Sequence, residues 1–596
     1  MKLSDYVMQF IADQGVRHVF MLPGGGAMHL NESLGRRDDI EFVCNLHEQA
    51  SAIAAEAYAK LTNGLGVVMV TSGPGGTNAI TGIASAWLDS MPVMVISGQV
   101  KRADLKRDSG VRILGVQEVD IVSIVDTITK YAVTIEDPST IRYHLEKALH
   151  LALAGRRGPV WIDIPLDVQG AQIDPAILDG YSVQPDPPDD RLPSHVAELV
   201  SLIRASERPV IVAGSGIRAA GAVDAFHQAI EKLQIPVLTT WLAMDLMPDV
   251  HPLFAGRPGS IAPRGANFAL QNADLMIVIG SRLDMAFTGY AHDKLARHAI
   301  KVMVDVDEAE IRKMKTQVHL PIVADAGDFL DELNRQLMDA MLPSDQDWAR
   351  RCQAWKERYP VVQPEHRALR NGVSTYHLSE ALAAELSDDD IVASGSSGAG
   401  IELFLLAFQV AGRQRVLHSR GLGSMGFGLP ASIGACLGSG QQRTICVEGD
   451  GSFHMNAQEL ETIRRLQLPI KVFVINNNGY ASIRASQENY FQHAVAADPS
   501  SGLTLPDVKG LAAAYGIQTL TISNQEDLRG QLRAVLNTPG PVVCEILAPL
   551  EEEREPRLST MQRPDGSMVS KPLEDLWPYL DREEFKANMI IEPLSE

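Results

Sequence analysis

Short apolar runs rich in β-branched residues recur along the chain, and each ends in Gly, Ser, Asp or Asn. Examples are "LGVVMVTSG" (65–73), "RPVIVAGSG" (208–216), "ADLMIVIGS" (273–281) and "RTICVEGDGS" (443–452). Helical patterns separate these runs. Continuous apolar runs of this length are typical of strands that helices cover on both faces. The pattern therefore predicts an α/β fold of open parallel sheets, whose ligands bind at the carboxyl ends of the strands.

Two polar, proline-rich stretches divide the chain. They are "SVQPDPPDDRLPSHV" (182–196) and "YPVVQPEHRALRNGVS" (359–374), and both are typical of linkers. Between them we expect three open parallel-sheet domains, at 1–180, 195–345 and 370–550, a number that suits 596 residues. Residues 551–596 break the alternation and predict an extended C-terminal arm followed by a short amphipathic helix.

Composition narrows the class of protein. The chain has 53 basic and 74 acidic residues, and its net charge of -21 repels nucleic acid and anionic membrane surfaces. The five cysteines are scattered and form no CxxC, so neither a disulfide framework nor a zinc site is indicated. The first residues lack the basic segment of a signal peptide, and no apolar run reaches the roughly 20 residues that span a bilayer. We therefore expect a cytoplasmic protein without nucleic acid or membrane partners.

Polar side chains follow two successive predicted strands in the last domain. One strand ends in "GDGS" (449–452) and the next in "NNNG" (476–479). In a βαβ unit both strand ends face one crevice, so oxygens of Asp450 and Asn477 and the carbonyl of Gly479 can meet there. Such hard ligands suit Mg²⁺ holding a diphosphate, and the glycines and the helix N-terminus after Ser452 would favour the phosphates. The alternative is that both motifs are ordinary turns.

The spacing of these two motifs resembles the signature of a known class of enzymes. Asn477 follows Asp450 by 27 residues, as in the signature of thiamine diphosphate (ThDP) enzymes. Four other segments resemble the large subunit of acetolactate synthase: "TSGPGGTNAITGIASAWLDSMPVMVISGQV" (71–100), "GVQEVD" (115–120), "RRGPVWIDIPLDVQG" (156–170) and "SRGLGSMGFGLPASIGA" (419–435). The resemblance extends from about residue 3 to 550. It implies a pyrimidine-binding first domain, a central Rossmann-like domain and a diphosphate-binding third domain.

Glu48 lies in "VCNLHEQAS" (43–51), where a predicted strand passes into an alanine-rich helix, with no Lys or Arg within five residues. The resemblance implies that Glu48 reaches N1′ of the cofactor's aminopyrimidine, shares a proton with it and so promotes the ylide at the thiazolium C2. Burial in an apolar interface, which disfavours a charged carboxyl, would support this role. The alternative is that Glu48 only stabilises the N-terminus of the helix.

The resemblance also implies the other contacts of ThDP. Met425, which would otherwise be core filler, bends the cofactor into a V, and the Gly423 carbonyl receives its 4′-amino group. The loop 72–76 and Gln117 lie near the substrate and face Glu48. In such enzymes the two ThDP-binding domains of one site belong to different subunits, so a homodimer or homotetramer is implied. The expected residues around the diphosphate and the metal are Gly395, Ser396, Gly449, Asp450, Gly451, Ser452, Asn477 and Gly479.

The central domain resembles the segments with which acetolactate synthases hold FAD. The positions that match are Gly214, Thr240, Arg282, Asp284, Asp305 and Asp325. An acidic residue at a strand end, as at Asp305, suits the hydroxyls of a ribose. The chain departs from the family at Ala286, where the family has Arg, and in "GRPGS" (256–260). We therefore predict FAD, with an empty vestigial pocket or another nucleotide as alternatives.

Several positions bear on the substrate. The adjacent His-His pair of pyruvate-type decarboxylases is absent from the sequence, which favours carbon-carbon bond formation over protonation. Ser486 stands where acetolactate synthases carry a tryptophan, so the acceptor site is predicted to be more open. Arg484 and Gln487 could contact a polar acceptor or face solvent. Lys130 aligns near the family's substrate channel or is a solvated surface residue.

Together these features predict a ThDP- and Mg²⁺-dependent lyase or transferase. It decarboxylates a 2-ketoacid, pyruvate, and transfers the acyl-anion unit to a second carbonyl. The stretch "NNNGYASIRASQENYF" (476–491) also resembles relatives that transfer an acetyl unit from pyruvate to a nucleotide ketosugar, and a hydrolase that cleaves a cyclohexanedione is a further relative. One alternative is therefore a ThDP/FAD enzyme that cleaves or oxidises a diketone, or a pyruvate carboligase that acts on a nucleotide ketosugar. A non-catalytic homologue is another, against which the intact Glu48, Asp450 and Asn477 argue.

Overall fold

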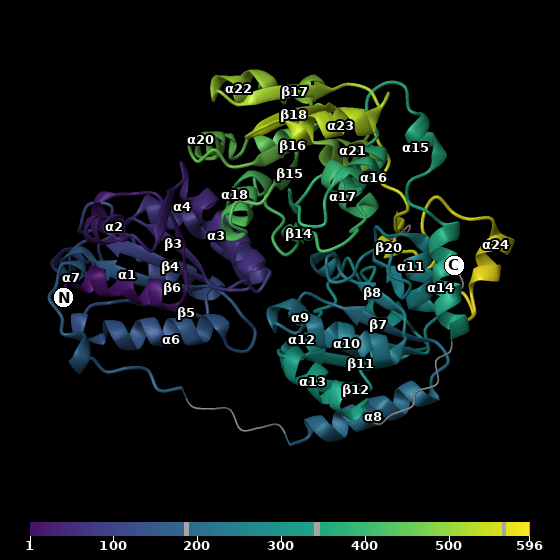
Figure 1. The fold of residues 1–596 in the computed structure, drawn as a ribbon, viewed down its shortest axis with the longest axis horizontal. Coiled ribbons are helices and arrows are strands. Elements are labelled where there is room, and N and C mark those ends of the chain that lie inside the picture. The colour runs from purple at the N-terminus through teal and green to yellow at the C-terminus, as the bar shows by residue number, and fades with distance from the viewer. Residues whose placement is uncertain (184–189, 339–345, 563–567, 595–596) are drawn as a thin grey trace. The chain divides into compact units, whose positions relative to one another are not determined.

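The computed structural model describes residues 1–183, 190–338, 346–562 and 568–594 (Figure 1). The chain forms two compact units. The first contains Met1–Pro185, Asp389–Ile401 and Arg415–Leu550, and the second contains Asp186–Asp388, Glu402–Gln414 and Glu551–Glu596. Residues 184–189 of the first predicted linker and 339–345 of the predicted central domain lie outside the described residues. Residues 192–196, expected as linker, are instead the beginning of a helix.

The first unit contains two six-stranded parallel sheets. The N-terminal sheet has the order β2-β1-β3-β4-β6-β5 and the C-terminal sheet the order β14-β13-β15-β16-β18-β17. The strands of the first are β1 (His18–Met21), β2 (Glu41–Cys44), β3 (Gly66–Val70), β4 (Val93–Gln99), β5 (Tyr131–Thr134) and β6 (Val160–Pro165). Those of the second are β13 (Ile391–Ser394), β14 (Arg415–Leu417), β15 (Thr444–Gly449), β16 (Ile470–Asn476), β17 (Gln518–Ile522) and β18 (Val542–Leu547).

Helices cover both faces of these sheets. In β3, Val67 and Met69 pack with one apolar core, and Val68 and Val70 pack with another on the opposite face. The helices of the N-terminal domain are α1 (Leu3–Asp13), α2 (Met28–Gly35), α3 (Glu48–Thr62), α4 (Pro74–Leu88), α5 (Ile121–Val125), α6 (Ile141–Leu153) and α7 (Leu166–Gln169). Those of the C-terminal domain are α18 (Gly428–Gly438), α19 (Asp450–Phe453), α20 (Leu460–Arg465), α21 (Ala481–Phe491), α22 (Val508–Ala514) and α23 (Leu528–Asn537).

The second unit is built on a third parallel sheet, of order β12-β11-β10-β7-β8-β9. Its strands are β7 (Pro209–Ala213), β8 (Val237–Thr239), β9 (Phe254–Gly256), β10 (Leu275–Ile279), β11 (Ile300–Asp305) and β12 (Leu320–Val323). Its helices are α8 (Leu192–Ala205), α9 (Gly216–Ala219), α10 (Val223–Leu233), α11 (Arg264–Gln271), α12 (Glu308–Arg312), α13 (Ala326–Gln336), α14 (Gln346–Arg358), α15 (Pro364–Ala368) and α16 (Thr375–Glu385). Helix α17 (Ala399–Ala407) runs from the first unit into the second.

The C-terminal residues belong to the second unit. They form a two-stranded hairpin, β19 (Thr560–Gln562) with β20 (Met568–Ser570), and the helix α24 (Arg582–Asn588). The arm is tied to α11, because Asn267 Nδ2 donates to the Leu573 carbonyl at 2.7 Å and Gln271 Nε2 donates to Glu574 at 2.7 Å. The predicted α/β class, with three open parallel sheets, is confirmed.

Candidate cofactor and metal site

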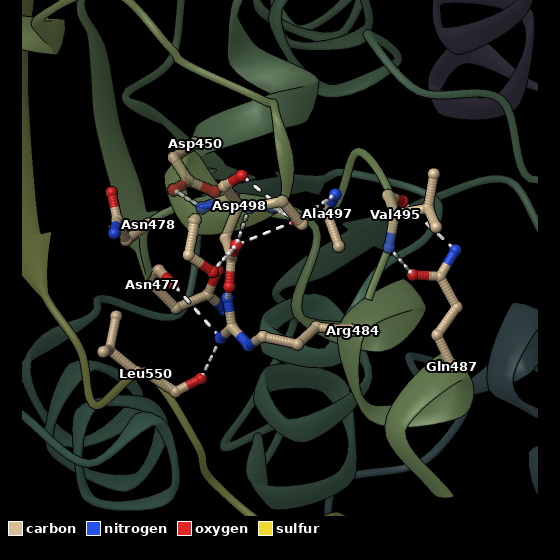
Figure 2. Close-up of polar contacts among 12 residues, drawn as sticks. Asp450, Asn477, Asn478, Arg484, Gln487, Val495, Ala497, Asp498 and Leu550 are labelled. Atoms are coloured by element: carbon tan, nitrogen blue, oxygen red, sulfur yellow. Dashed lines mark hydrogen bonds and ion pairs between the residues drawn. The ribbon is translucent and has the colours of Figure 1, made fainter. Parts of the chain in front are cut away.

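Strands β15 and β16 place the two predicted metal motifs at one sheet edge. They pair in parallel, with Gly449 opposite Ile475, so Asp450 and Asn477 both follow at their carboxyl ends. Asp450 is only 3% exposed. Its Oδ1 accepts a hydrogen bond from Gly451 N–H and its Oδ2 accepts one from Gly479 N–H, each at 2.8 Å (Figure 2). The carboxylate therefore lies directly against the loop that carries the other two expected ligands.

The donor set at this edge fits Mg²⁺. Burial raises the pKa of Asp450 to about 6, opposed by the N–H groups of Gly479 and Gly451 and by the charge of Arg484. In the described part of the chain the Asn477 side chain has no protein hydrogen bond. The described residues of the chain contain no cluster of three or more His, Cys, Asp or Glu that could hold a metal. One carboxylate, one amide oxygen and one carbonyl are what a metal completed by diphosphate and water would use.

The segment around Met425 is held in an unusual backbone path. Gly423 has φ +70° and Gly426 has φ +80°, in the left-handed region that glycine adopts most easily. Ser396 Oγ donates a hydrogen bond to the Ser424 carbonyl. The segment is therefore fixed on both sides of Met425 by its own conformation and by the predicted diphosphate loop.

A row of three polar side chains forms hydrogen bonds with the backbone that follows Met425. Ser452 Oγ accepts from Gly426 N–H at 2.7 Å, and Asn456 Nδ2 donates to the Gly426 carbonyl at 2.7 Å. Glu448 Oε2 accepts from the N–H of Gly428, the first residue of α18, at 2.7 Å. The sequence interpretation included Ser452 but missed Glu448 and Asn456. Their spacing of four residues on either side of Ser452 was the available signal.

Glu448 also explains the glycine at position 395. A Cβ on Gly395 would lie 2.2 Å from Glu448 Oε1, a buried atom with no hydrogen-bond partner in the described structure. Burial raises the pKa of Glu448 to about 7. Only glycine therefore fits beside this carboxyl, and position 395 is itself buried. A glycine at this position would let the backbone come close to a diphosphate.

Glu48 is the first residue of α3, and it does not cap that helix. The N-cap is His47, whose Nδ1 accepts from Gln49 N–H at 3.1 Å. Glu48 is 5% exposed, and its Oε2 accepts from Asn78 Nδ2 at 3.0 Å. No ion pair of Glu48 is present among the described residues. The carboxyl is thus buried beside a neutral donor in the first turn of α3.

The loop 72–76 of the N-terminal domain lies against Glu48 and against the loop that carries Gln117. A Cβ on Gly75 would lie 3.7 Å from Glu48 Oε1, and one on Gly73 would lie 2.7 Å from the Gln117 carbonyl. The loop 72–76 therefore touches both. A third loop, "PGGG" (23–26), was missed from the sequence, although three glycines after a strand were a signal. Gly26 N–H donates to Thr71 Oγ1 at 3.0 Å.

Within the first unit the two ThDP-type domains pack directly on each other. Helix α3 lies along α18, so close that a Cβ on Gly434 would be 1.9 Å from the Ala54 carbonyl oxygen (Figure 1). Glu459 accepts from Asn45 Nδ2 and Leu46 N–H, each at 2.8 Å. The contact joins the turn before Glu48 to the helical segment that follows Asn456.

A buried charge cluster adds to this packing. Lys60 Nζ donates to Glu56 at 2.7 Å, to Asp89 at 3.0 Å and to the His418 carbonyl at 2.9 Å. Asp89 also accepts from Gly421 N–H at 2.8 Å. The loop that leads to Gly423 and Met425 is therefore anchored on the N-terminal domain of the same chain.

The residues considered for the acceptor and the channel have other partners. Gln487 accepts from Val495 N–H at 2.7 Å, and Ser486 Oγ donates to the Ser482 carbonyl at 2.9 Å on the exposed side of α21. Lys130 Nζ donates to the carbonyls of residues 154 and 156 at 2.6 and 2.8 Å, and burial lowers its pKa. Lys130 is thus partly buried and ties two backbone segments together.

Arg484 is buried rather than solvent-facing. It is 5% exposed and points into the protein from α21, toward Asn477, Asp498 and the Leu550 carbonyl (Figure 2). Its guanidinium is held by these protein groups, so the solvent-facing alternative is wrong.

The predicted FAD residues gather at one edge of the central sheet. Gly214, Thr240, Arg282, Asp305 and Asp325 come at or just after the ends of β7, β8, β10, β11 and β12, respectively, and Asp284 follows two residues after Arg282. A Cβ on Gly214 would lie 2.1 Å from the Gly280 carbonyl. Asp325 caps α13 by accepting from Gly327 N–H at 2.7 Å. The edge is the ligand-binding edge of an open parallel sheet, so the placement fits a nucleotide.

Comparisons with known proteins agree with this geometry. The chain matches the thiamine pyrophosphate enzyme N-terminal TPP binding domain at residues 1–124, the central domain at 196–333 and the C-terminal TPP binding domain at 399–546. These three domains define a ThDP-dependent enzyme.

Similarity to individual proteins identifies the family within this class. The chain is 33% identical to the acetolactate synthase large subunit of Lactococcus lactis, with 93% of this chain and 94% of the relative covered. It is 32% identical to the chloroplastic acetolactate synthase of Arabidopsis thaliana (94% and 83% covered) and to the acetolactate synthase isozyme 1 large subunit of Escherichia coli (93% and 95%). The chain belongs to the acetolactate synthase family of ThDP enzymes. Among its described residues no helix is long and apolar enough to cross a membrane.

Proposed function

We propose that this enzyme decarboxylates pyruvate and transfers the resulting two-carbon unit to a second 2-ketoacid or other carbonyl. The observation that carries the proposal is the pairing, in one chain, of a buried, unneutralised Glu48 with the "GDGS" and "NNNG" edge. The relatives named above are acetolactate synthases. Cleavage or oxidation of a diketone, and transfer to a nucleotide ketosugar, are therefore not favoured.

Each of these residues would have a separate role. Asp450, Asn477 and Gly479 would hold Mg²⁺ against the diphosphate, with Gly395, Ser396, Gly449, Gly451 and Ser452 beside it. ThDP, when bound, supplies the nucleophilic carbon and the electron sink for decarboxylation. Glu48 would hold and share a proton at N1′ of the pyrimidine ring, and the Gly423 carbonyl and Met425 would orient that ring. Gln117 would face the substrate.

We extend the proposal to FAD in the central domain. Support comes from the gathering of Gly214, Thr240, Arg282, Asp284, Asp305 and Asp325 at one sheet edge. Ala286, where the family has Arg, removes one polar contact. Visible flavin absorbance in the purified protein would support this cofactor, and a colourless, active enzyme would remove it from the account.

A homodimer or homotetramer is part of the proposal, with each site formed by ThDP domains of two subunits. The loop that carries Gln117 has a run of exposed apolar side chains, Val111, Ile113, Leu114 and Val116. Such a run favours a protein contact over solvent. All five cysteines are free, which fits a reducing compartment such as the cytoplasm. Domain boundaries at 180, 195, 345, 370 and 550 remain our predictions.

The acceptor is tested with a panel of substrates. Purified enzyme, ThDP, Mg²⁺ and pyruvate are incubated with 2-ketoacids, aldehydes, diketones and a nucleotide ketosugar, and the products are identified by mass spectrometry. Acetolactate or a larger acetohydroxy acid is the expected product. The exposed Ser486, in place of a tryptophan, predicts that acceptors larger than pyruvate react. Acetaldehyde or acetate as the sole product would refute carboligation.

A further inference from the structure

Arg484 connects three segments around the metal loop. Its Nη2 donates to the carbonyl of Leu550, beyond the end of β18, and lies 3.5 Å from the Asn477 carbonyl. Its Nη1 lies 3.5 Å from Asp498 Oδ2. Figure 2 shows the guanidinium between these groups, with the Asp450 carboxylate on the other side of the loop. A buried guanidinium is costly unless such partners satisfy it, so its position is well determined.

Asp498 belongs to a tight turn that packs on the same loop. Its Oδ1 accepts from Ser501 N–H at 3.0 Å, and the carbonyl of the preceding Ala497 accepts from Tyr480 N–H at 2.7 Å. A Cβ on Gly479, whose φ is +126°, would lie 2.4 Å from that Ala497 carbonyl. The metal loop 477–480 is therefore enclosed between Asp450 on one side and the Asp498 turn on the other.

We propose that Arg484 and Asp498 are positioning residues for the metal loop, holding the Asn477 and Gly479 oxygens where Mg²⁺ requires them. Mg²⁺ accepts little departure from octahedral geometry, so a loop fixed before binding gives a higher affinity. The inference rests on the Mg²⁺ and ThDP site of the proposed function. It adds two residues that do not touch the metal.

A purely electrostatic role makes a different prediction. An unpaired arginine near the site would repel Mg²⁺, and Asp498 would neutralise it. On that account, removing the charge of Arg484 strengthens Mg²⁺ binding, and Arg484→Lys, which keeps the charge, leaves it unchanged. If Arg484 acts by position, both Arg484→Met and Arg484→Lys weaken binding, because neither can bridge Asn477, Asp498 and Leu550 at once.

The experiment measures Mg²⁺ affinity directly. Apo-enzyme with ThDP is titrated with Mg²⁺ by calorimetry for the wild type, Arg484→Met, Arg484→Lys and Asp498→Asn. The matched control is Gln487→Ala, on the same helix, which releases only Val495 at the exposed end. We expect the three test variants to bind Mg²⁺ about tenfold more weakly, the scale seen when the supports of metal ligands are removed. The control should match the wild type, and kcat at saturating Mg²⁺ should stay within about threefold.

Each outcome decides the inference. Tighter binding by Arg484→Met, unchanged binding by Arg484→Lys, or a loss of kcat without a change in Mg²⁺ affinity would overturn it. If Arg484→Met does not fold, the lysine variant decides alone. A wild-type enzyme whose ThDP binding is independent of Mg²⁺ would contradict the proposed function itself, which separates that failure from this one.

Discussion

Replacing Glu48 by glutamine is the most direct test of the site. Glutamine has the same shape, and its carbonyl oxygen can still accept the hydrogen bond from Asn78 Nδ2, 3.0 Å away in the wild type. Glu48 has no salt bridge among the described residues, and His47 supplies the cap of α3. The substitution therefore removes one property, the ability to give and take a proton, and leaves the packing in place.

The expected changes in stability and in rate follow from the contacts that glutamine keeps and from the proton transfer that it loses. Changing the acceptor of one hydrogen bond from a carboxylate to a neutral amide costs about 1 kcal/mol of folding stability. Loss of a positioned acid-base group costs roughly a factor of 100 to 10,000 in rate. At 1.36 kcal/mol for each factor of ten, this is about 3–5 kcal/mol in the activation barrier. Catalysis should thus suffer several times more than stability.

The assay separates binding from chemistry. ThDP and Mg²⁺ binding to Glu48→Gln is measured by calorimetry and pyruvate consumption by steady-state kinetics at saturating cofactor. His47→Ala serves as the control, since it loses the helix cap at a cost of about 1 kcal/mol in stability and keeps the carboxyl. We expect Glu48→Gln to bind ThDP and to lose at least about a hundredfold in kcat. Undiminished turnover, or an equal loss in His47→Ala, would refute the assigned role.

Three further predictions concern the surrounding structure. Burial raises the pKa of Asp163 to about 7 from 3.8, so the folded state binds more protons than the unfolded state between these values. The free energy of unfolding should fall by up to roughly 4 kcal/mol as pH rises from about 4 to about 7, and Asp163→Asn should flatten this slope in denaturant titrations. Gly434→Ala forces a Cβ to within 1.9 Å of the Ala54 carbonyl and should cost about 1–3 kcal/mol, seen as a lower Tm by calorimetry. Asn456→Ala leaves the Gly426 carbonyl without its donor and should lower kcat roughly tenfold to a hundredfold at unchanged Mg²⁺ affinity. A pH slope that persists in Asp163→Asn would contradict the first argument, and an unchanged Tm of Gly434→Ala would contradict the second. A wild-type kcat of Asn456→Ala would contradict the third.

The fold class could be predicted because each strand carries its own signal. In β3 every residue is buried, with successive side chains on opposite faces, so the sequence shows an unbroken apolar run. The placement of Asp450 and Asn477 followed from the same logic. Both residues come directly after such runs, and parallel neighbours end at one edge.

The contacts of Arg484 could not be predicted in this way. Helix α21, "ASIRASQENYF", has no apolar stripe that would show which side faces the protein. The partners of Arg484 lie 7, 14 and 66 residues away, in a loop, a turn and the segment after β18. Asn456 was missed for a similar reason, because its partner Gly426 is brought close only when α18 packs beside β15. Side-chain contacts that form only in the folded domain are hard to recognise in the local sequence pattern.

The row formed by Glu448, Ser452 and Asn456 has a consequence for how the enzyme could be controlled. Asp450 lies inside this same nine-residue stretch, so the proposed anchor of the diphosphate and the support of the Met425 segment belong to one continuous segment. The groups that would hold the two ends of the cofactor therefore lie close together in the sequence. In the proposed two-subunit site Glu48 comes from the N-terminal domain of another subunit, so its distance to the cofactor would depend on how the subunits associate. Weakened subunit association should therefore reduce turnover while ThDP and Mg²⁺ remain bound.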